Sequence, residues 1–170
     1  LIFSAYLNQC GMNTVLFDSR DFIKTQNGKG VFLNSEQTNK NLEAVKNVEF
    51  QVALFPGFIA SGQKGEMTLL GRGGSDYTAS ILATGLKCSE LEIWTDVSGM
   101  FTADPRLVSQ AQPIEQMSFQ EAMELSHFGA KVIYPPTLIP VLQNKINVRI
   151  KNTFAPDEKG TLITSAPKSE

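Results

Sequence analysis

Short apolar runs alternate along the chain with stretches of helical spacing, which predicts strands alternating with helices. The first residues place apolar side chains three and four apart up to Gly11, so we predict an opening helix that ends at a glycine cap. Helices are also predicted over residues 38–47, 75–86, 118–128 and 137–143, the last interrupted at Pro140. Strands are predicted over residues 12–17, 31–33, 50–55, 67–70, 91–95, 148–151 and 161–163, with the rest of 19–40 irregular.

Two of these predicted helices carry start signals. Ser75 is placed as the N-cap of the helix over 75–86, with Asp76 in its first turn. Ser118 and Glu121 have capping-box spacing, and Gly129 closes that helix.

Strands that alternate with helices predict an α/β sandwich with a mainly parallel sheet. The run over 50–55 is nearly continuous in apolar residues, which indicates a strand buried on both faces. In such sheets ligands bind beyond the carboxyl ends of the strands. The site is therefore expected in the loops after Phe55, Leu70 and Thr95.

The composition fits a folded globular domain and excludes two kinds of partner. Of 170 residues, 42% are hydrophobic and 19% charged. Lys and Arg number 15 against 17 Asp and Glu, so no basic excess exists to bind nucleic acid. The most apolar run, residues 52–60, contains a proline and a glycine and is too short for a bilayer, so no membrane partner is expected.

Cysteine and histidine usage gives no sign of a disulfide framework or a metal site. Cys10 and Cys88 are far apart, and neither belongs to a CxxC pair. We interpret them as helix-packing thiols in a reducing cytoplasm. The single histidine, His127, has no cysteine cluster to join, which argues against zinc.

The first candidate loop, residues 56–65, nearly imitates a phosphate-binding P-loop. Gly57 and Gly62 have the right spacing, but Lys64 comes one position late and no Ser or Thr follows it. The P-loop is therefore excluded. A mobile hairpin and a loop that contacts a ligand remain as interpretations.

The second loop, residues 71–77, has three glycines that let the backbone approach a ligand, and it leads into a helix N-terminus that favours an anion. Arg72 adds a planar donor for a carboxylate or phosphate. Asp76 either caps the helix or takes part in chemistry. The segment is not a dinucleotide fingerprint, because Asp76 stands where the third glycine belongs.

The third loop, residues 94–106, is either an Asx turn before a proline-started segment or part of a nucleotide pocket. In the second interpretation Thr95 and Asp96 supply polar contacts, Phe101 an apolar wall, and Arg106 a phosphate contact.

Several segments, in this order and spacing, resemble aspartate kinase, a member of the amino-acid kinases. They are residues 71–77, 94–99, 102–106, 129–132, 152–154 and 160–161. The resemblance extends from Leu1 to about Ile163. It implies an incomplete three-layer αβα sandwich of the carbamate kinase-like type. It also implies ATP-dependent phosphorylation of the L-aspartate side-chain carboxylate, the first step toward lysine, threonine and methionine.

The resemblance implies a role for each matching residue. Arg72 and the backbone of Gly73, Gly74 and Ser75 would hold aspartate, and Asp76 would be the catalytic aspartate. The positions that resemble the ATP site are Thr95, Asp96, Phe101, Arg106, Lys131 and Val132. Phe101 stands where many members have tyrosine, so the apolar wall is kept without the hydroxyl. Mg²⁺ would be held mainly through the nucleotide phosphates, with no metal ligand expected from the protein.

The family also has an N-terminal Lys-Phe-Gly-Gly loop and C-terminal ACT domains, which these residues lack. Residues 1–165 are therefore expected to be the C-terminal, nucleotide-binding part of a kinase domain, inactive alone, with a tail over 166–170. The parent is expected to be a cytoplasmic homo-oligomer. Residues 134–136, Tyr-Pro-Pro, replace the usual His-Pro, which points to a subfamily such as the kinase half of bifunctional aspartokinase–homoserine dehydrogenases.

Two alternatives remain open on the sequence. Another amino-acid kinase, such as acetylglutamate, glutamate 5- or uridylate kinase, would share the fold, although residues 72–77 with 104–106 favour aspartate. A non-catalytic nucleotide-binding subunit is the other, although such subunits in this family carry regulatory domains.

Overall fold

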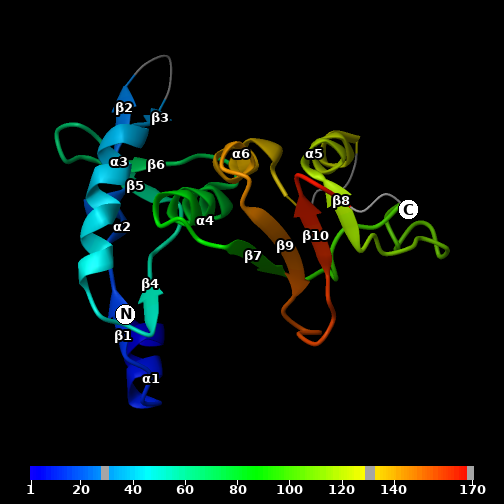
Figure 1. Ribbon diagram of the computed structural model, residues 1–170, viewed down its shortest axis with the longest axis horizontal. Helices are drawn as coiled ribbons and strands as arrows, with labels where there is room; N and C mark the ends of the chain where they lie inside the picture. The colour runs from blue at the N-terminus through cyan, green and yellow to red at the C-terminus, as the bar shows by residue number, and fades with distance from the viewer. Residues whose placement is uncertain (28–30, 129–132, 168–170) are drawn as a thin grey trace. The chain divides into compact units, whose positions relative to one another are not determined.

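The computed structural model describes residues 1–27, 31–128 and 133–167 (Figure 1). Their contacts divide the chain into two compact units, Leu1–Thr78 and Ala79–Glu170, and each is described by itself. Helix α4 (Gly74–Gly85) begins in the first unit and ends in the second. None of the described helices is both long enough and apolar enough to cross a membrane.

The first unit is built from short elements. In chain order they are α1 (Ile2–Gln9), β1 (Thr14–Leu16), α2 (Ser19–Phe22), β2 (Thr25–Asn27), β3 (Val31–Leu33), α3 (Ser35–Leu42), the 3₁₀ helix η1 (Glu43–Asn47), β4 (Val52–Leu54), β5 (Ile59–Ser61) and β6 (Met67–Leu69). Strands β1 and β4 pair in parallel, while β2 with β3 and β5 with β6 form antiparallel hairpins. The opening helix is confirmed, and Gly11 follows it with a φ of 84°.

Strand β4 differs from its prediction. Its three residues are half-buried rather than buried on both faces. The physical reason is that, among the described strands, β1 alone pairs with it. Beyond the strand ends, Phe17 stacks on Phe55 with ring centroids 5.0 Å apart, and Phe22 meets both rings edge-on. This aromatic cluster fixes where the two strands end.

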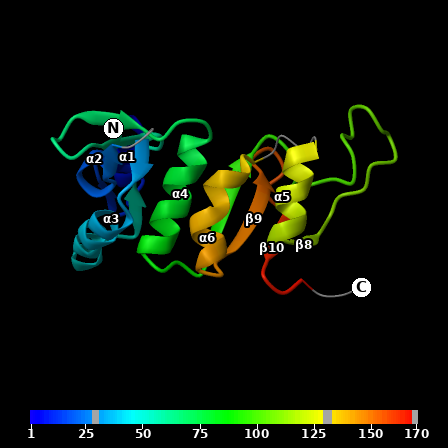
Figure 2. The ribbon, with the colours of Figure 1, turned by 90° about the horizontal axis from the view of Figure 1, so that it is seen from above.

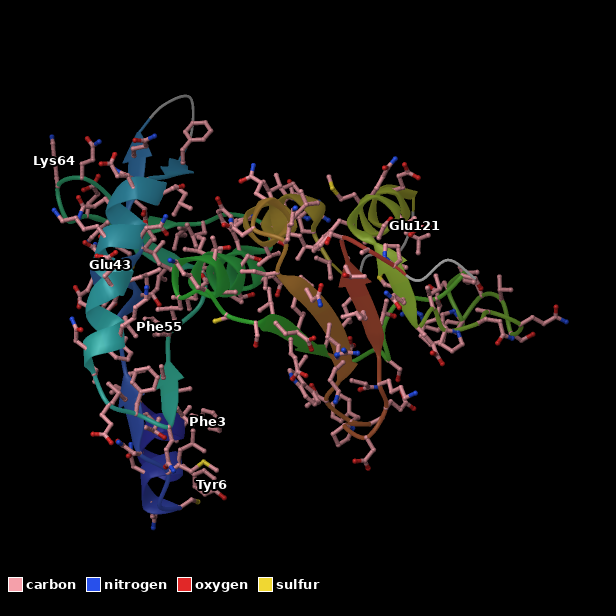
Figure 3. The ribbon with its side chains drawn as sticks, viewed as in Figure 1. Phe3, Tyr6, Glu43, Phe55, Lys64 and Glu121 are labelled. Carbon is pink, nitrogen blue, oxygen red and sulfur yellow. The ribbon has the colours of Figure 1, made fainter. Side chains whose placement is uncertain are left out.

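Helix α1 leaves its apolar side chains in solvent. Phe3 is 61% and Tyr6 59% exposed, and no residue of the helix is buried (Figure 3). Cys10 follows the helix and is also exposed, as is Cys88. The interpretation of both cysteines as packed thiols was therefore wrong, although both are free.

The second unit holds a four-stranded sheet. Its elements after α4 are β7 (Glu90–Thr95), β8 (Gln116–Ser118), α5 (Phe119–Phe128), the 3₁₀ helix η2 (Pro135–Leu138), α6 (Ile139–Gln143), β9 (Asn147–Asn152) and β10 (Thr161–Thr164). The strand order is β7-β9-β10-β8. The outer pairs, β7 with β9 and β8 with β10, are parallel, and the central pair is antiparallel. The prediction of a mainly parallel sheet is confirmed.

Burial alternates along the strands of this sheet. Leu91, Ile93, Val148 and Ile150 are buried in the core that the helices share. Helices α5 and α6 lie over the same face of β9 and β10 (Figure 2). The other face carries exposed or half-buried polar and aromatic side chains, among them Glu92, Trp94, Arg149 and Lys151. This alternation is typical of a strand with one face in the core.

Two predicted helix starts have different outcomes. The capping box of α5 is confirmed, because the Ser118 amide donates to Glu121 Oε2 at 2.7 Å and the Glu121 amide donates to Ser118 Oγ at 3.1 Å. These bonds hold the pKa of Glu121 below its usual range. Helix α4, however, begins at Gly74, so Ser75 lies in its first turn and is not the N-cap. Gly129, predicted to close α5, lies outside the described residues.

Pro140 does not interrupt a helix, contrary to the prediction. It lies in the first turn of α6, where its missing N–H has no helical acceptor to lose.

Strand β10 fixes the segment that follows β7 through one buried hydroxyl. Thr161 is fully buried, and its Oγ1 donates to the Ile114 carbonyl at 2.6 Å and accepts from the Met100 amide at 2.7 Å. Gly99 precedes Met100 with a φ of 103°, and a Cβ there would lie 2.4 Å from the same hydroxyl. Only glycine therefore fits at this crossing.

Replacing Thr161 with valine tests this crossing. Valine keeps the shape but leaves the buried Met100 amide and the partly buried Ile114 carbonyl without this partner, so we expect T161V to lower the free energy of unfolding by about 2–4 kcal/mol. The matched control is T164V on the same strand, where Thr164 Oγ1 accepts only a long 3.5 Å bond from the Ala166 amide. Urea denaturation followed by circular dichroism measures both. Equal stability of the two variants would contradict the assignment.

Candidate functional site

The glycine loop ends directly at the start of α4 in the first unit. Gly71 and Gly73 have φ values of 77° and 67°, a region that favours glycine. The Gly74 amide donates to the Gly71 carbonyl at 3.0 Å, and the Tyr77 amide donates to the Gly73 carbonyl at 2.9 Å. The loop is thus a tight turn that leads the chain straight into the helix.

Two of the three predicted loops come together at this helix start. A Cβ on Gly74 would lie 2.6 Å from Phe58 Cδ2, and one on Gly57 would lie 3.1 Å from Ser75 Cα. The segment after β4 therefore packs against the first turn of α4. A side chain at Gly74 would displace Phe58, and one at Gly57 would crowd Ser75, so both glycines allow the two loops to lie close together.

Phe58 and Thr78 hold this arrangement, and sequence reasoning missed both. Phe58 has a φ of 76°, which is strained for a residue with a side chain. Its amide donates to Thr78 Oγ1 at 3.0 Å, and Thr78 Oγ1 donates to the Gly74 carbonyl at 2.8 Å. The one available signal was a threonine four residues after the first helical glycine, a spacing that lets its hydroxyl reach back.

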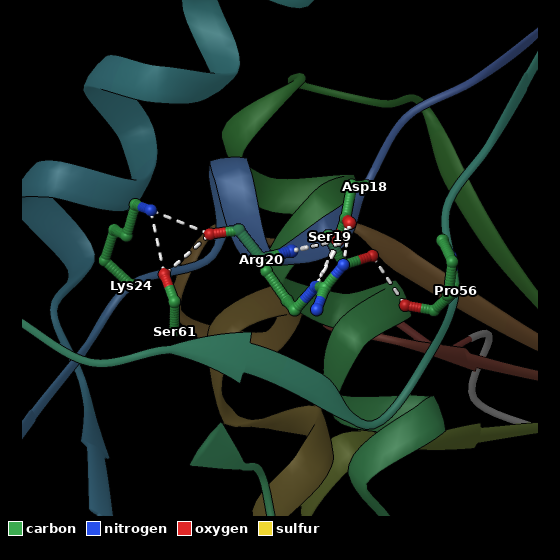
Figure 4. Close-up of polar contacts among 6 residues, drawn as sticks. All are labelled: Asp18, Ser19, Arg20, Lys24, Pro56 and Ser61. Atoms are coloured by element: carbon green, nitrogen blue, oxygen red, sulfur yellow. Dashed lines mark hydrogen bonds and ion pairs between the residues drawn. The ribbon is translucent and has the colours of Figure 1, made fainter. Parts of the chain in front are cut away.

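Helix α2, in a stretch predicted to be irregular, contacts the same segment through hydrogen bonds at Pro56 and Ser61 (Figure 4). Ser19 Oγ donates to the Pro56 carbonyl at 2.5 Å. Lys24 Nζ donates to Ser61 Oγ at 2.8 Å and to the Arg20 carbonyl at 2.7 Å, which ties α2 to β5. A polar hollow lies here, but the predicted site residues do not line it; its lining is Asp18, Arg20, Asp21, Lys24, Ser61 and Gly65.

The first candidate loop forms a β-hairpin of β5 and β6, which agrees with the hairpin of one of its two interpretations. Strand β5 was not predicted, and its Ala60 and Ser61 are buried. The Gly62 amide donates to the Glu66 carbonyl at 2.8 Å and closes the turn, with Lys64 exposed at its tip. Contact of this loop with a ligand stays a prediction.

The two charged residues at the start of α4 differ in how far they are buried. Arg72 is exposed, whereas Asp76 is half-buried, and burial raises the pKa of its carboxyl. Ionising Asp76 therefore costs stability, which the amides of the helix N-terminus offset only in part. Together these residues place an exposed arginine near a partly desolvated carboxylate.

In the second unit, the predicted nucleotide residues begin where β7 ends. Thr95 pairs in register with Asn152, and the Thr153 amide donates to the Thr95 carbonyl at 2.8 Å. Thr95 Oγ1 donates to Asp96 Oδ1 at 3.2 Å. The carboxyl ends of two parallel strands thus meet at this edge, as expected for a ligand site in a parallel sheet.

Phe101 and Arg106 lie further along the same segment. Phe101 is half-buried and forms a β-bridge with Pro113, which folds the intervening residues back on themselves. The Arg106 guanidinium donates two hydrogen bonds to the Asp104 carboxylate, from Nε to Oδ1 at 3.1 Å and from Nη2 to Oδ2 at 2.9 Å. These bonds raise the pKa of Arg106 and lower that of Asp104, and Asp96 adds to the shift of Arg106. The carboxylate of Asp96 is thus within electrostatic reach of the guanidinium.

Two predicted residues, Lys131 and Val132, lie outside the described residues. Within the described part of the chain, no group of three or more His, Cys, Asp or Glu side chains is arranged to hold a metal ion.

Comparison with known proteins defines the class. The chain matches the amino acid kinase family over residues 1–152. It belongs to this family, which confirms the predicted family and the predicted αβα fold class.

Its relatives include aspartokinases. The chain is 47% identical over 154 residues to the bifunctional aspartokinase/homoserine dehydrogenase of Haemophilus influenzae, an alignment covering 88% of this chain and 19% of that protein. It is 39% identical over 166 residues to the lysine-sensitive aspartokinase 3 of Escherichia coli, covering 96% and 37%. The structure of E. coli aspartokinase III in complex with aspartate and ADP matches with a TM-score of 0.87 at 37% identity, over 99% of this chain and 38% of that one. The chain thus spans about a fifth to two fifths of the length of these relatives.

The opposite environments of two carboxylates in the first unit give a pH prediction. The raised pKa of Asp76 means that the folded state binds its proton more tightly than the unfolded state, so stability falls as pH rises through that pKa. We therefore expect D76N to be more stable than the parent to thermal unfolding at neutral pH. The gain should shrink as pH falls toward the ordinary carboxyl value of 3.8.

Asp18 provides the contrasting control in the same unit. Hydrogen bonds from Arg20 lower its pKa to about 2, so its ionised form stabilises the fold at neutral pH. We expect D18N to lower the thermal midpoint slightly, because the pair is exposed, and the loss to vanish as pH falls from 3.8 to about 2. Shifts of the same sign in both variants would contradict the assigned environments.

Proposed function

We propose that the protein acts in the ATP-dependent phosphorylation of the side-chain carboxylate of L-aspartate to 4-phospho-L-aspartate. The observation that carries the proposal is the glycine loop at the start of α4, where Gly74 has no room for a side chain and Asp76 is partly desolvated. A small anionic substrate suits this loop because backbone amides and Arg72 offer donors while the helix dipole favours negative charge. The likeness to a structure in complex with aspartate and ADP supports the same substrates.

The reaction needs little general acid–base catalysis from the protein. A carboxylate oxygen of aspartate attacks the γ-phosphorus of ATP, a P–O bond forms, and the bond from that phosphorus to the β,γ-bridging oxygen breaks, releasing ADP. Because the nucleophile is already ionised, catalysis consists mainly of positioning and charge neutralisation. This accords with a site that has cationic and amide donors and no assigned histidine.

Within the first unit, Arg72 and the backbone of Gly73, Gly74 and Ser75 would hold aspartate. Asp76, the catalytic residue of the proposal, would orient the reacting end through a carboxylate that burial keeps poorly solvated. Its strained neighbour Phe58 and the hydroxyl of Thr78 keep this turn in place.

Within the second unit, Thr95, Asp96, Phe101 and Arg106 would bind ATP, together with Lys131 and Val132. Thr95 and Asp96 supply polar atoms at the strand edge, Phe101 an apolar surface, and Arg106 a guanidinium for phosphate. Mg²⁺ carried on the nucleotide phosphates would supply charge neutralisation there. Residues 1–165 are proposed as the C-terminal, nucleotide-binding part of the kinase domain of a cytoplasmic, homo-oligomeric enzyme.

The two arginines provide the sharpest test of this division of roles. In the whole protein we expect R72A to raise KM for aspartate about tenfold or more, because a charge-assisted contact is lost, with KM for ATP little changed. R106A should raise KM for ATP and leave KM for aspartate little changed. A coupled assay of ADP release measures both. An identical effect of the two variants on both substrates would contradict the division.

The choice of substrate is tested on the same protein. We expect ADP release with L-aspartate and none with acetylglutamate, glutamate or UMP, and we expect D76N to lose about a hundredfold or more of kcat. Turnover with another acceptor would assign a different amino acid kinase. ATP binding without turnover on any acceptor would instead support a non-catalytic nucleotide-binding subunit.

A further inference from the structure

The asparagine that ends β9 reaches across to the turn after β7. Asn152 Nδ2 donates to Ser98 Oγ at 2.9 Å, while its Oδ1 accepts from the Phe154 amide at 2.9 Å. Both Asn152 and Ser98 are half-buried, so this bond is partly shielded from competing water. One side chain thus connects the two loops that follow β7 and β9. The two strands lie side by side and run in the same direction (Figure 1).

The segment from Thr95 to Phe101 is held at two points. Asn152 fixes Ser98 in its middle, and the buried hydroxyl of Thr161 fixes the Met100 amide near its end. Asp96 and Val97, between the strand and the first anchor, are exposed. Without the bond to Ser98, the next side-chain anchor after this exposed stretch in the described chain would be Thr161, which holds the Met100 amide.

We propose that Asn152 is a positioning residue of the nucleotide site, which acts through Ser98 to hold Thr95 and Asp96 in their binding geometry. The inference rests on the proposed function, because it takes these two residues as contacts of ATP. Its physical basis is preorganisation: a turn that is already ordered loses less conformational entropy when a ligand binds. Asn152 itself need not touch the nucleotide.

The test compares N152A with N147A in the whole protein. Asn147 begins the same strand, pairs with Glu90, and is equally half-buried, so it controls for the loss of an asparagine from β9. Isothermal titration with MgATP should show a Kd about tenfold higher for N152A and unchanged for N147A, as expected for loss of the bond to Ser98. The thermal midpoint of N152A should lie somewhat below that of N147A, because N152A also loses the bond from the Phe154 amide.

Two further measurements distinguish a positioning role of Asn152 from a general loss of stability. KM for ATP should rise in N152A while KM for aspartate and kcat stay near parent values. The S98A variant keeps the bond between the Phe154 amide and Asn152, yet it should match N152A in affinity for MgATP. The double variant should bind MgATP no more weakly than either, because both remove the bond from Asn152 to Ser98. Additive losses, or equal losses in N147A, would overturn the inference.

Failure of the inference is distinct from failure of the proposed function. If the parent binds MgATP and N152A binds it equally well, the positioning role is wrong and the nucleotide site stands. If the parent binds no MgATP, the proposed function is wrong and the inference falls with it.

Discussion

The parallel pairing of β7 with β9 is the constraint on which the second unit depends. Six consecutive residue pairs join the two strands, from Glu90 with Asn147 to Thr95 with Asn152. Because parallel strands run in the same direction, both end at the same edge, and their following loops emerge side by side. Thr95, Asp96, Ser98 and Asn152 are neighbours for this reason, although more than fifty residues separate the two loops in the chain.

The first unit depends instead on two glycines, Gly57 and Gly74, which have no side chain to separate neighbouring segments. Gly57 and Gly74 allow the segment after β4 to lie against the start of α4 at distances that any Cβ would disturb. The polar anchors of α2 and the hydroxyl of Thr78 then fix a turn that Phe58 adopts under strain. Rigid placement of backbone amides is what a loop needs if it is to recognise an anion without a large ordering penalty.

Local signals in the sequence predicted local structure well. The capping box at Ser118 and Glu121, the glycine after α1 and the strands predicted over 91–95, 148–151 and 161–163 appear where expected, whereas β8 was not predicted. These features depend on residues within one turn or one strand of each other. The predictions failed where residues distant in the chain determine the local structure. Helix α2 is short and polar, and it is held by contacts with Pro56 and Ser61, which lie 37 residues or more away in the chain.

For the candidate site too, some features could be predicted from the sequence and others could not. The glycine loop and the end of β7 could be found from residue types and spacing, because glycines, Arg72 and Thr95 carry recognisable chemistry. The half-buried state of β4, the exposure of the cysteines and the strained Phe58 could not, because burial is set by the packing of several elements. Asn152 stood in a recognised segment, but only the strand register shows which turn it reaches.

The position of β10 in the sheet bears on the order in which the protein acquires structure during synthesis. Strand β8 pairs only with β10 among the described strands, and the hydroxyl that holds Met100 comes from Thr161, 61 residues later. Contacts so distant in sequence form late, because the loop between them must close first. The turn that follows β7 therefore gains its second anchor only after β10 has left the ribosome, so a growing chain would carry this edge in a loosely held form until then.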